Sequence, residues 1–335
     1  MRVQVNARNR AFQFEADKGE KILYAGLRAQ AGLPYECATG TCGTCKAKLV
    51  AGRIDDAWPN APGKKSLKAG EFLMCQCTAQ SEVSLEVASF VYPAEPGAGR
   101  VDALGGTLRA VRPLTHDVSA FDVDLDTPCD FDAGQFMAVT APGVRGMRGY
   151  SMVNYERGAK RLEFVVKKKP GGGFSEWLFS DRAAGARLDL FGPLGKATFH
   201  PDLGKNLLCI AGGSGIAGMM SILARADEAD YFSRHSGHVF FGVRTMKDAF
   251  FLDQLSKTKA QVTIALSEED PPSTSTQLRF ERGLVHEVAK RAMAGKYQNV
   301  RAYLAGPPPA VDAAIRVLLL EAKLTADNIR YDKFS

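Results

Sequence analysis

The chain opens with short stretches in which apolar and polar residues alternate. Such alternation runs through Met1 to Phe14, on both sides of Ala7 to Arg10, and it predicts two strands joined as a hairpin. From Gly19 to Ala31 the apolar residues instead recur at helical spacing. Alternation returns near Cys45 to Leu49 and at Val83 to Val87. This region is therefore predicted to combine one helix with a small sheet.

The region from Arg100 to about Pro201 consists of short alternating segments separated by turn residues, with one helical stretch around Trp177. Regular short strands of this kind predict an antiparallel barrel. The predicted strands are Leu108 to Arg112, Ser119 to Leu125, Gln135 to Thr140, Leu162 to Lys167 and Arg187 to Phe191.

After Pro201, apolar runs that look buried on both faces alternate with helical stretches, which predicts a parallel sheet covered by helices. The predicted strands are Asn206 to Ala211, Gly237 to Gly242, Gln261 to Leu266 and Val300 to Ala305. A segment rich in proline and glycine, from Pro93 to Gly99, separates the first region from the second. We therefore predict three domains, over residues 1–93, 100–200 and 201–335.

Composition and charge exclude several classes of protein. Hydrophobic residues make up 45% and charged residues 24%, as in ordinary globular proteins. The net charge of +6 is mild and no long basic run occurs, so nucleic acid is not an expected partner. No apolar run reaches the roughly 18 residues of a membrane span, and the alternation at the start is unlike a signal peptide. We expect a cytoplasmic protein without a membrane partner.

Five of the seven cysteines lie between Cys37 and Cys77, which points to metal or redox chemistry rather than disulfides. Cys37, Cys42 and Cys45 have the spacing C-x4-C-x2-C with glycine and threonine between them, and Cys75 follows. Small residues allow the backbone to wrap around a [2Fe–2S] cluster and to point N–H groups at its sulfurs. Zinc sites usually pair C-x2-C with a second close pair and do not explain the small residues. The fourth ligand is Cys75 or Cys77.

This segment resembles the plant-type [2Fe–2S] ferredoxin family, which implies a β-grasp domain. The spacing in that family favours Cys75 as the fourth ligand beside Cys37, Cys42 and Cys45, and it leaves Cys77 as a buried neighbour.

Two segments of the predicted barrel resemble the flavin-binding motifs R-x-Y-S and G-x-x-S of the ferredoxin–NADP reductase superfamily. The first is Arg148-Gly149-Tyr150-Ser151, and the second runs from Val166 to Ser175 and leads through a glycine turn into a helix. A glycine turn before a helix favours phosphate, because its N–H groups are free and the helix dipole attracts negative charge.

The resemblance implies a role for each of these residues. Arg148 pairs with the flavin diphosphate, Tyr150 stacks on the ring, Ser151 lies near the reactive nitrogen, and Ser175 caps the helix beneath the phosphates. Phe334, next to the end of the chain, either covers the flavin or is a packed tail residue. The remaining expected flavin-binding residues are Val166, Lys167 and Gly172. FAD is favoured over FMN, because the FMN-dependent branch places its ferredoxin domain last. The fold implied for this region is a Greek-key barrel.

A glycine-rich loop, Gly212-Gly213-Ser214-Gly215-Ile216, follows a predicted strand and precedes a helix. Ligands gather at the carboxyl ends of parallel strands, so this position favours nucleotide binding. The loop resembles the GGxGxxP nicotinamide loop of the same superfamily, and Gly306-Pro307-Pro308 resembles its CGPP turn. Two residues depart from these motifs. Gly218 replaces the proline and is expected mainly to loosen the start of the helix, and Ala305 replaces the cysteine near the hydride-donating carbon.

The adenosine end of the nucleotide is expected near Arg244, which follows the next predicted strand. One arginine does not make a cluster able to clamp a 2′-phosphate, so NADH is favoured over NADPH.

The order of the three regions resembles the NADH-dependent reductases of multicomponent aromatic oxygenases, and the segment from Trp58 to Gly63 is similar to toluene 4-monooxygenase reductases. The resemblance implies that electrons pass from NADH to FAD, then to the cluster, and then to a Rieske-type ferredoxin or an oxygenase component. Two alternatives stay open. One is a reductase of a deoxysugar-dehydratase system, which has the same domain order. The other is a redox carrier or sensor with slow NADH turnover, which Ala305 favours.

Overall fold

The computed structural model describes residues 1–93, 99–180, 183–273 and 278–333. The chain divides into two compact units. The first unit comprises Met1–Leu104, Met137–Gly149 and Asp189–Leu194, and the second comprises Gly105–Phe136, Tyr150–Leu188 and Gly195–Ser335. No helix among the described residues is long and apolar enough to cross a bilayer. The three predicted domains follow a different division of the chain, and their bounds remain a prediction.

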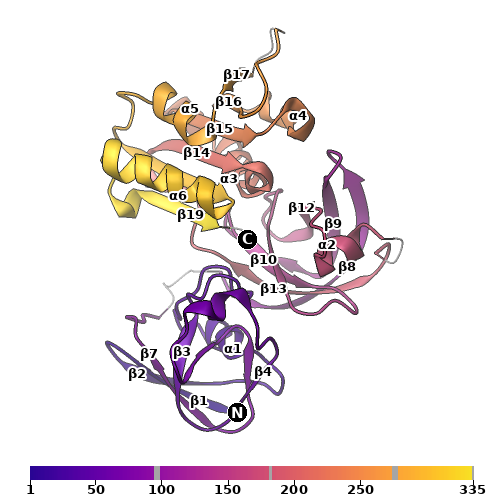
Figure 1. Cartoon of the computed structure of the whole chain (residues 1–335), viewed down its shortest axis with the longest axis vertical. Helices are drawn as coiled ribbons and strands as arrows, with labels where there is room; N and C mark the ends of the chain where they lie inside the picture. Colours follow the sequence, from indigo (N-terminus) through magenta and orange to yellow (C-terminus); the bar gives the residue numbers. More distant parts are fainter. Residues whose placement is uncertain (94–98, 181–182, 274–277, 334–335) are drawn as a thin grey trace. The chain divides into compact units, whose positions relative to one another are not determined.

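A mixed five-stranded sheet, in the order β2-β1-β7-β3-β5, forms the core of the first unit (Figure 1). Val3 and Val5 of β1 are fully buried, as alternation predicts. The hairpin of β1 and β2 is antiparallel, whereas β1 pairs with β7 in parallel. The elements are β1 Arg2–Ala7, β2 Ala11–Glu15, α1 Ile22–Arg28, β3 Lys46–Ala51, β4 Ile54–Asp56, β5 Glu71–Leu73, β6 Cys77–Ala79 and β7 Val83–Val87, with β4 and β6 paired separately.

The helix α1 is shorter than its apolar pattern predicts. Gly19, with φ +82°, precedes it, and Gln30, with φ +57°, follows it. Left-handed residues do not continue a right-handed helix, so the helix is confined to Ile22–Arg28, of which only Arg28 is not buried.

The middle of the chain forms a six-stranded sheet in the order β11-β10-β13-β8-β9-β12. Neighbouring strands β8, β9 and β12 are antiparallel, which agrees with the predicted antiparallel barrel. All five predicted strands are present, and β11 is an additional one. The elements are β8 Asp102–Pro113, β9 Val118–Cys129, β10 Phe136–Thr140, β11 Arg148–Ser151, β12 Ala159–Lys167, α2 Gly173–Leu178 and β13 Arg187–Leu194.

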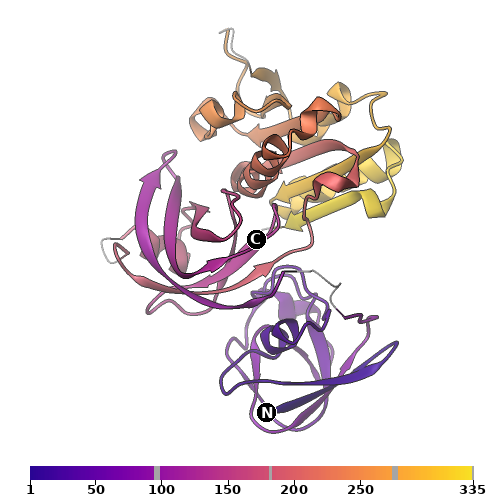
Figure 2. The ribbon, with the colours of Figure 1, turned by 180° about the vertical axis from the view of Figure 1, so that it is seen from behind.

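The last part of the chain is a parallel sheet in the order β17-β16-β15-β14-β18-β19. Side chains of β14 alternate between two cores: Cys209 packs with α3, and Ile210 packs with α5 and α6. Figures 1 and 2 show these helices on opposite faces. The elements are β14 Asn206–Gly212, α3 Ile216–Glu228, β15 Gly237–Val243, α4 Leu252–Leu255, β16 Gln261–Leu266, β17 Arg279–Arg282, α5 Val285–Ala292, β18 Val300–Gly306, α6 Pro308–Arg316 and β19 Ile329–Lys333. The fold class expected for this region is confirmed.

Candidate functional site

The loop after α1 directs backbone N–H groups at its cysteine sulfurs. The N–H groups of Thr39 and Cys42 each donate to Cys37 Sγ at 3.4 Å. The N–H group of Thr44 donates to Cys42 Sγ at 3.5 Å. Hydrogen bonds of this kind stabilise negative charge on thiolates and influence the potential of a bound cluster.

Two glycines of the loop are required by its backbone. Gly40 and Gly43 have φ values of +94° and +80°, in the region that glycine occupies at little cost. The backbone of Gly63 approaches both: its N–H donates to Gly40 O at 3.0 Å, and its carbonyl O lies 2.8 Å from where a Cβ of Gly43 would stand. Gly40 and Gly43 are therefore needed both for the turns of the backbone and for its close packing against Gly63.

Four cysteine side chains of this loop and its surroundings lie in two hydrogen-bonded pairs, Cys37 with Cys42 and Cys45 with Cys75. The hydrogen bond from Cys42 lowers the pKa of Cys37. The pKa of Cys45 is raised, first by the hydrogen bond with Cys75 as the larger cause and second by burial. Two irons that each take two thiolates require two such pairs, so this donor set fits a [2Fe–2S] cluster.

Cys77 is in a different environment, at the start of β6. It is fully buried, and burial raises its pKa to about 12. Asp56 and Lys64 are among its charged neighbours. The geometry therefore supports the expectation that Cys75, rather than Cys77, completes the cluster site.

Tyr24 of α1 supports the cluster loop from within the first unit. Its hydroxyl donates to Ala38 O at 3.0 Å, and its ring stacks on Phe191 with 4.1 Å between centroids and 13° between planes. Burial raises the pKa of Tyr24 well above its ordinary value, so the phenol is neutral and able to donate. The sequence alone did not identify this residue, because a tyrosine on the apolar side of a helix looks like any core residue.

Two of the expected flavin-binding residues, Arg148 and Tyr150, have contacts within their own units. Arg148 belongs to the first, where its guanidinium donates to Met147 O at 2.9 Å and lies 5.8 Å from the ring centroid of Trp58. Tyr150 belongs to the second, where its ring meets Phe121 edge-on at 5.5 Å and Phe174 at 5.0 Å. These contacts fix the Tyr150 ring at the start of the helix α2.

Ser175 does not cap α2 as expected. The helix begins at Gly173 with Gly172 as its N-cap, so Ser175 is its third residue. Its hydroxyl instead accepts the N–H of Lys169 at 3.1 Å and donates to Gly172 O at 3.0 Å. Because the chain folds back before the helix, the serine stabilises the glycine turn rather than the free helix end.

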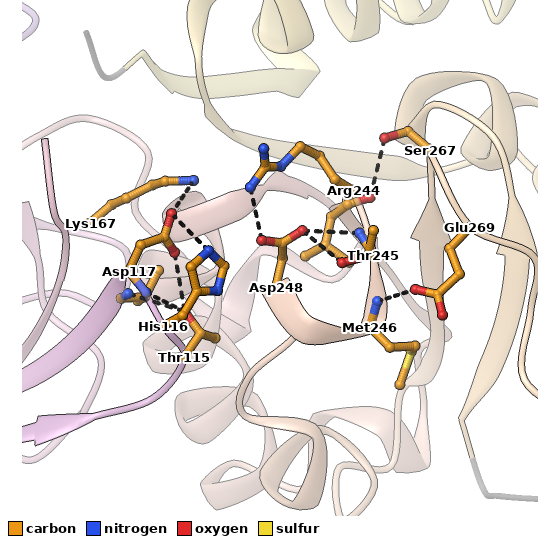
Figure 3. Close-up of polar contacts among 12 residues, drawn as sticks. Thr115, His116, Asp117, Lys167, Arg244, Thr245, Met246, Asp248, Ser267 and Glu269 are labelled. Atoms are coloured by element: carbon orange, nitrogen blue, oxygen red, sulfur yellow. Dashed lines mark hydrogen bonds and ion pairs between the residues drawn. The ribbon is translucent and has the colours of Figure 1, made fainter.

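Two further expected residues sit on β12. Val166 is buried and pairs with Ser119 of β9. The Lys167 ammonium is 3.2 Å from the carboxylate of Asp117, which follows β8 (Figure 3). The side chain of Lys167 is therefore held by an acidic residue of the neighbouring turn.

The two glycine-containing loops expected to hold the nicotinamide meet at the carboxyl ends of adjacent strands, β14 and β18. A Cβ on Gly215 would lie 2.3 Å from Ala305 O, and one on Gly306, whose φ is +146°, would lie 2.9 Å from Gly212 O. The other expected residues flank this contact: Gly213 and Ser214 lie in a short 3-10 turn, Ile216 begins α3, and Pro307 and Pro308 open α6.

The helix that follows the nucleotide loop, α3, approaches Ser151 of the flavin motif. A Cβ on Gly218, in the first turn of α3, would lie 3.3 Å from Ser151 Cβ. One turn later, the fully buried Ser221 accepts the N–H of Gly134 at 2.9 Å and donates to Gly218 O at 2.9 Å. The glycine at position 218 was expected mainly to loosen the start of the helix. The helix is continuous from Ile216 to Glu228, and the absent side chain instead allows it to approach Ser151.

Arg244 directly follows β15 as expected, but its side chain is paired with an acidic residue. Its guanidinium lies 3.0 Å from Asp248 Oδ1, and Asp248 also accepts the N–H and hydroxyl of Thr245 (Figure 3). Glu268 is a further acidic neighbour of Arg244, and Glu269 accepts the N–H of Met246 at 2.7 Å. Asp248 was not predicted from the sequence, although Thr245-x-x-Asp248 is a capping-box spacing that could have identified it.

Phe334 lies outside the described residues. The strand that precedes it, β19, runs beside β18 so that Lys333 is the partner of Gly306. Lys333 forms an ion pair with Asp312 at 2.8 Å.

Three family models match consecutive parts of the chain. The 2Fe-2S iron-sulfur cluster binding domain matches residues 5–80, the oxidoreductase FAD-binding domain matches residues 106–199, and the oxidoreductase NAD-binding domain matches residues 209–316. The expected cofactor classes, an iron–sulfur cluster, FAD and a nicotinamide nucleotide, are confirmed by these matches.

Relatives share this organisation over almost their full length. The chain is 36% identical to the ferredoxin–NAD(P)+ reductase CarAd of Metapseudomonas resinovorans, over 94% of this chain and 95% of that protein. It is 31% identical to the ferredoxin–NAD+ reductase component of the alkene monooxygenase system of Xanthobacter autotrophicus, over 97% and 98%. The ferredoxin reductase in carbazole 1,9a-dioxygenase has the same fold, with a TM-score of 0.84, 34% identity, and coverage of 100% and 99%. The chain therefore belongs to the family of ferredoxin–NAD(P)+ reductases that join an iron–sulfur, an FAD-binding and an NAD-binding domain in one chain.

Proposed function

We propose that this protein is the NADH-dependent reductase component of a multicomponent oxygenase, passing electrons through FAD and a [2Fe–2S] cluster to a ferredoxin or oxygenase partner. The observation that carries the proposal is the close approach of α3, the helix that follows the nucleotide loop, to the flavin motif at Gly218 and Ser151. The paired thiols of the first unit supply the second redox site in the same chain. Relatives with this organisation serve carbazole, alkene and xylene or toluene oxygenases.

The proposal assigns each expected residue to one of three groups. Cys37, Cys42, Cys45 and Cys75 hold the cluster. The flavin is held by Arg148, Tyr150, Ser151, Val166, Lys167, Gly172 and Ser175, with Phe334 as its cover. The nicotinamide nucleotide is held by Gly212, Gly213, Ser214, Gly215, Ile216, Arg244, Gly306, Pro307 and Pro308.

The residues of the chain position the reactants. A flavin bound by these residues would supply two-electron chemistry towards the nicotinamide and one-electron chemistry towards the iron–sulfur cluster. The close backbones of Gly215 and Ala305 shape the nucleotide loop, and Gly218 lets the following helix, α3, approach Ser151. Tyr150 is held by Phe121 and Phe174, so that an aromatic face is fixed in advance. The N–H groups of the cysteine loop stabilise charge at the sulfurs. Correct placement of this kind supplies much of the rate in hydride transfer.

The acidic surroundings of Arg244 support NADH as the donor. Its guanidinium is already paired with Asp248, and Glu268 adds negative charge. A 2′-phosphate needs an unpaired cation, whereas acidic side chains suit a free ribose hydroxyl.

We expect NADH to exceed NADPH in kcat/KM by roughly tenfold or more, because unfavourable like charges cost over about 1.4 kcal/mol. Steady-state reduction of an artificial acceptor with each nucleotide measures this ratio. Equal or higher kcat/KM with NADPH contradicts the expectation.

The acceptor and the location complete the proposal. None of the seven cysteines, all of which lie in the described part of the chain, takes part in a disulfide, which supports a cytoplasmic location. The partner is a Rieske-type ferredoxin or the oxygenase component itself, and the mild positive charge of the chain suits an acidic partner.

An anaerobic titration of the purified protein with NADH tests the function. Bleaching of both the flavin and the cluster bands is expected. Bleaching of the flavin alone would contradict the relay to the cluster. Absence of any bleaching would favour a redox sensor with slow NADH turnover, for which Ala305 in place of the usual cysteine is the supporting observation.

A further inference from the structure

The side-chain amide of Gln76 lies next to Cys75, one of the cysteines expected to bind the cluster. The residue is only 6% exposed, and its side-chain Nε2 lies 3.5 Å from Cys75 Sγ. A thiolate accepts hydrogen bonds and cannot donate them, so it selects the amide nitrogen of Gln76 rather than the amide oxygen. The hydrogen bond therefore comes from a side chain, in contrast to the backbone N–H groups that serve Cys37 and Cys42.

The cluster loop leaves room for this amide. A Cβ on Gly40 would lie 2.9 Å from Nε2 and 3.0 Å from Cδ of Gln76. Gly40 and the Gln76 amide are therefore in direct contact, although they are far apart in the sequence. Any side chain at position 40 would displace the amide from Cys75.

Hydrogen bonds hold both the carbonyl group and the N–H group of Gln76. Its carbonyl O accepts Lys21 Nζ at 2.8 Å and the N–H of Ala57 at 3.1 Å. Its own N–H donates to Leu73 O at 2.9 Å. With the backbone held at three points, the side chain starts from a defined position and its amide is directed at the sulfur.

A hydrogen-bond donor at a ligand sulfur stabilises the reduced cluster more than the oxidised one, because reduction adds one negative charge. Surrounding groups of this kind regularly tune metal sites. We propose that Gln76 is a positioning residue that raises the reduction potential of the cluster through its amide bond to Cys75, with Lys21 holding its backbone. The inference rests on the proposed function, in that Cys75 is taken as a cluster ligand. No bond is made or broken: one electron enters the cluster, and the amide proton stays on Gln76.

The test is a potentiometric titration of full-length protein with dithionite, followed by electron paramagnetic resonance of the reduced cluster. Gln76→Met keeps the length of the side chain and removes the donor. The matched control is Gln80→Met, because the amide of Gln80 donates to Thr78 Oγ1 at 3.1 Å and not to a cluster cysteine. We expect Gln76→Met to lower the potential by about 59 mV, a tenfold change in the one-electron equilibrium constant. Gln76→Glu should lower it at least as far, and Gln80→Met should leave it unchanged.

A potential of Gln76→Met that matches that of Gln80→Met overturns the inference and leaves the amide a packing group. If Gln76→Met fails to hold a cluster, wild-type protein labelled with ¹⁵N in the glutamine side-chain amide provides the answer. A ¹⁵N hyperfine coupling to the reduced cluster supports the inference, and its absence refutes it. Dithionite bypasses NADH and flavin, so failure of this inference is distinct from failure of the proposed function, which would show as wild-type protein without a cluster signal.

Discussion

Full-length Cys75→Ser protein is expected to lose its iron–sulfur absorbance, whereas Cys77→Ser protein retains it. Cys75 is hydrogen-bonded to Cys45, and Cys37 and Cys42 form the second pair. A cluster of two irons needs all four thiolates, so removal of Cys75 leaves one iron with a single cysteine. Iron content should fall from about two per chain to near zero.

The measurement is the visible spectrum together with iron analysis of the purified variants. Cys77→Ser is the matched control: it lies two residues away and is equally buried, but it sits on β6 with Asp56 and Lys64 as neighbours. The flavin bands should be similar in both variants and serve as an internal reference. Loss of the cluster in Cys77→Ser but not in Cys75→Ser would overturn the assignment.

Strands whose burial alternates strictly were predictable from the sequence, and the two edge strands of the last sheet were not. The strand β7, Val83–Val87, has its apolar residues on one buried face, and its bounds match the alternation. The edge strands β17 and β19 are rich in arginine, lysine and acidic residues. Their strand character comes from pairing with β16 and β18, not from their own pattern, because edge strands commonly carry charge on exposed positions.

The candidate site likewise combines features that could be predicted from the sequence with features that could not. Local motifs such as the cysteine loop and the glycine-rich turn carry their chemistry in adjacent residues, so their positions were readable. Contacts between distant segments were not, as Gly40 with Gln76 and Gly218 with Ser151 show. The role expected of Ser175 was wrong for a related reason. The type of residue favours a cap, but the preceding chain determines which backbone groups its hydroxyl can reach.

Gly215→Ala is expected to slow reduction of the flavin by NADH by roughly 100-fold, the cost of displacing reactants by about 1 Å. The backbone of Gly215 has φ −61°, which alanine adopts without strain. The difficulty is purely one of space, because the new Cβ would lie 2.3 Å from Ala305 O and 2.5 Å from its carbonyl carbon. These are backbone atoms of β18, so they cannot rotate away as a side chain could. The loop at the end of β14 must therefore separate from the turn at the end of β18.

Stopped-flow absorbance under anaerobic conditions measures this rate, and reduction by dithionite should be unchanged because it bypasses the nucleotide. Gly213→Ala is the control, because it introduces backbone strain without a close contact, the reverse of Gly215→Ala. A Cβ there meets nothing within 4 Å, but the φ of +53° is left-handed and costs about 1–2 kcal/mol of stability. Gly213→Ala should lower stability while leaving the approach of the two loops intact. A rate for Gly215→Ala within about threefold of wild type, a loss under ~0.7 kcal/mol, would mean that this close approach does not position the nicotinamide.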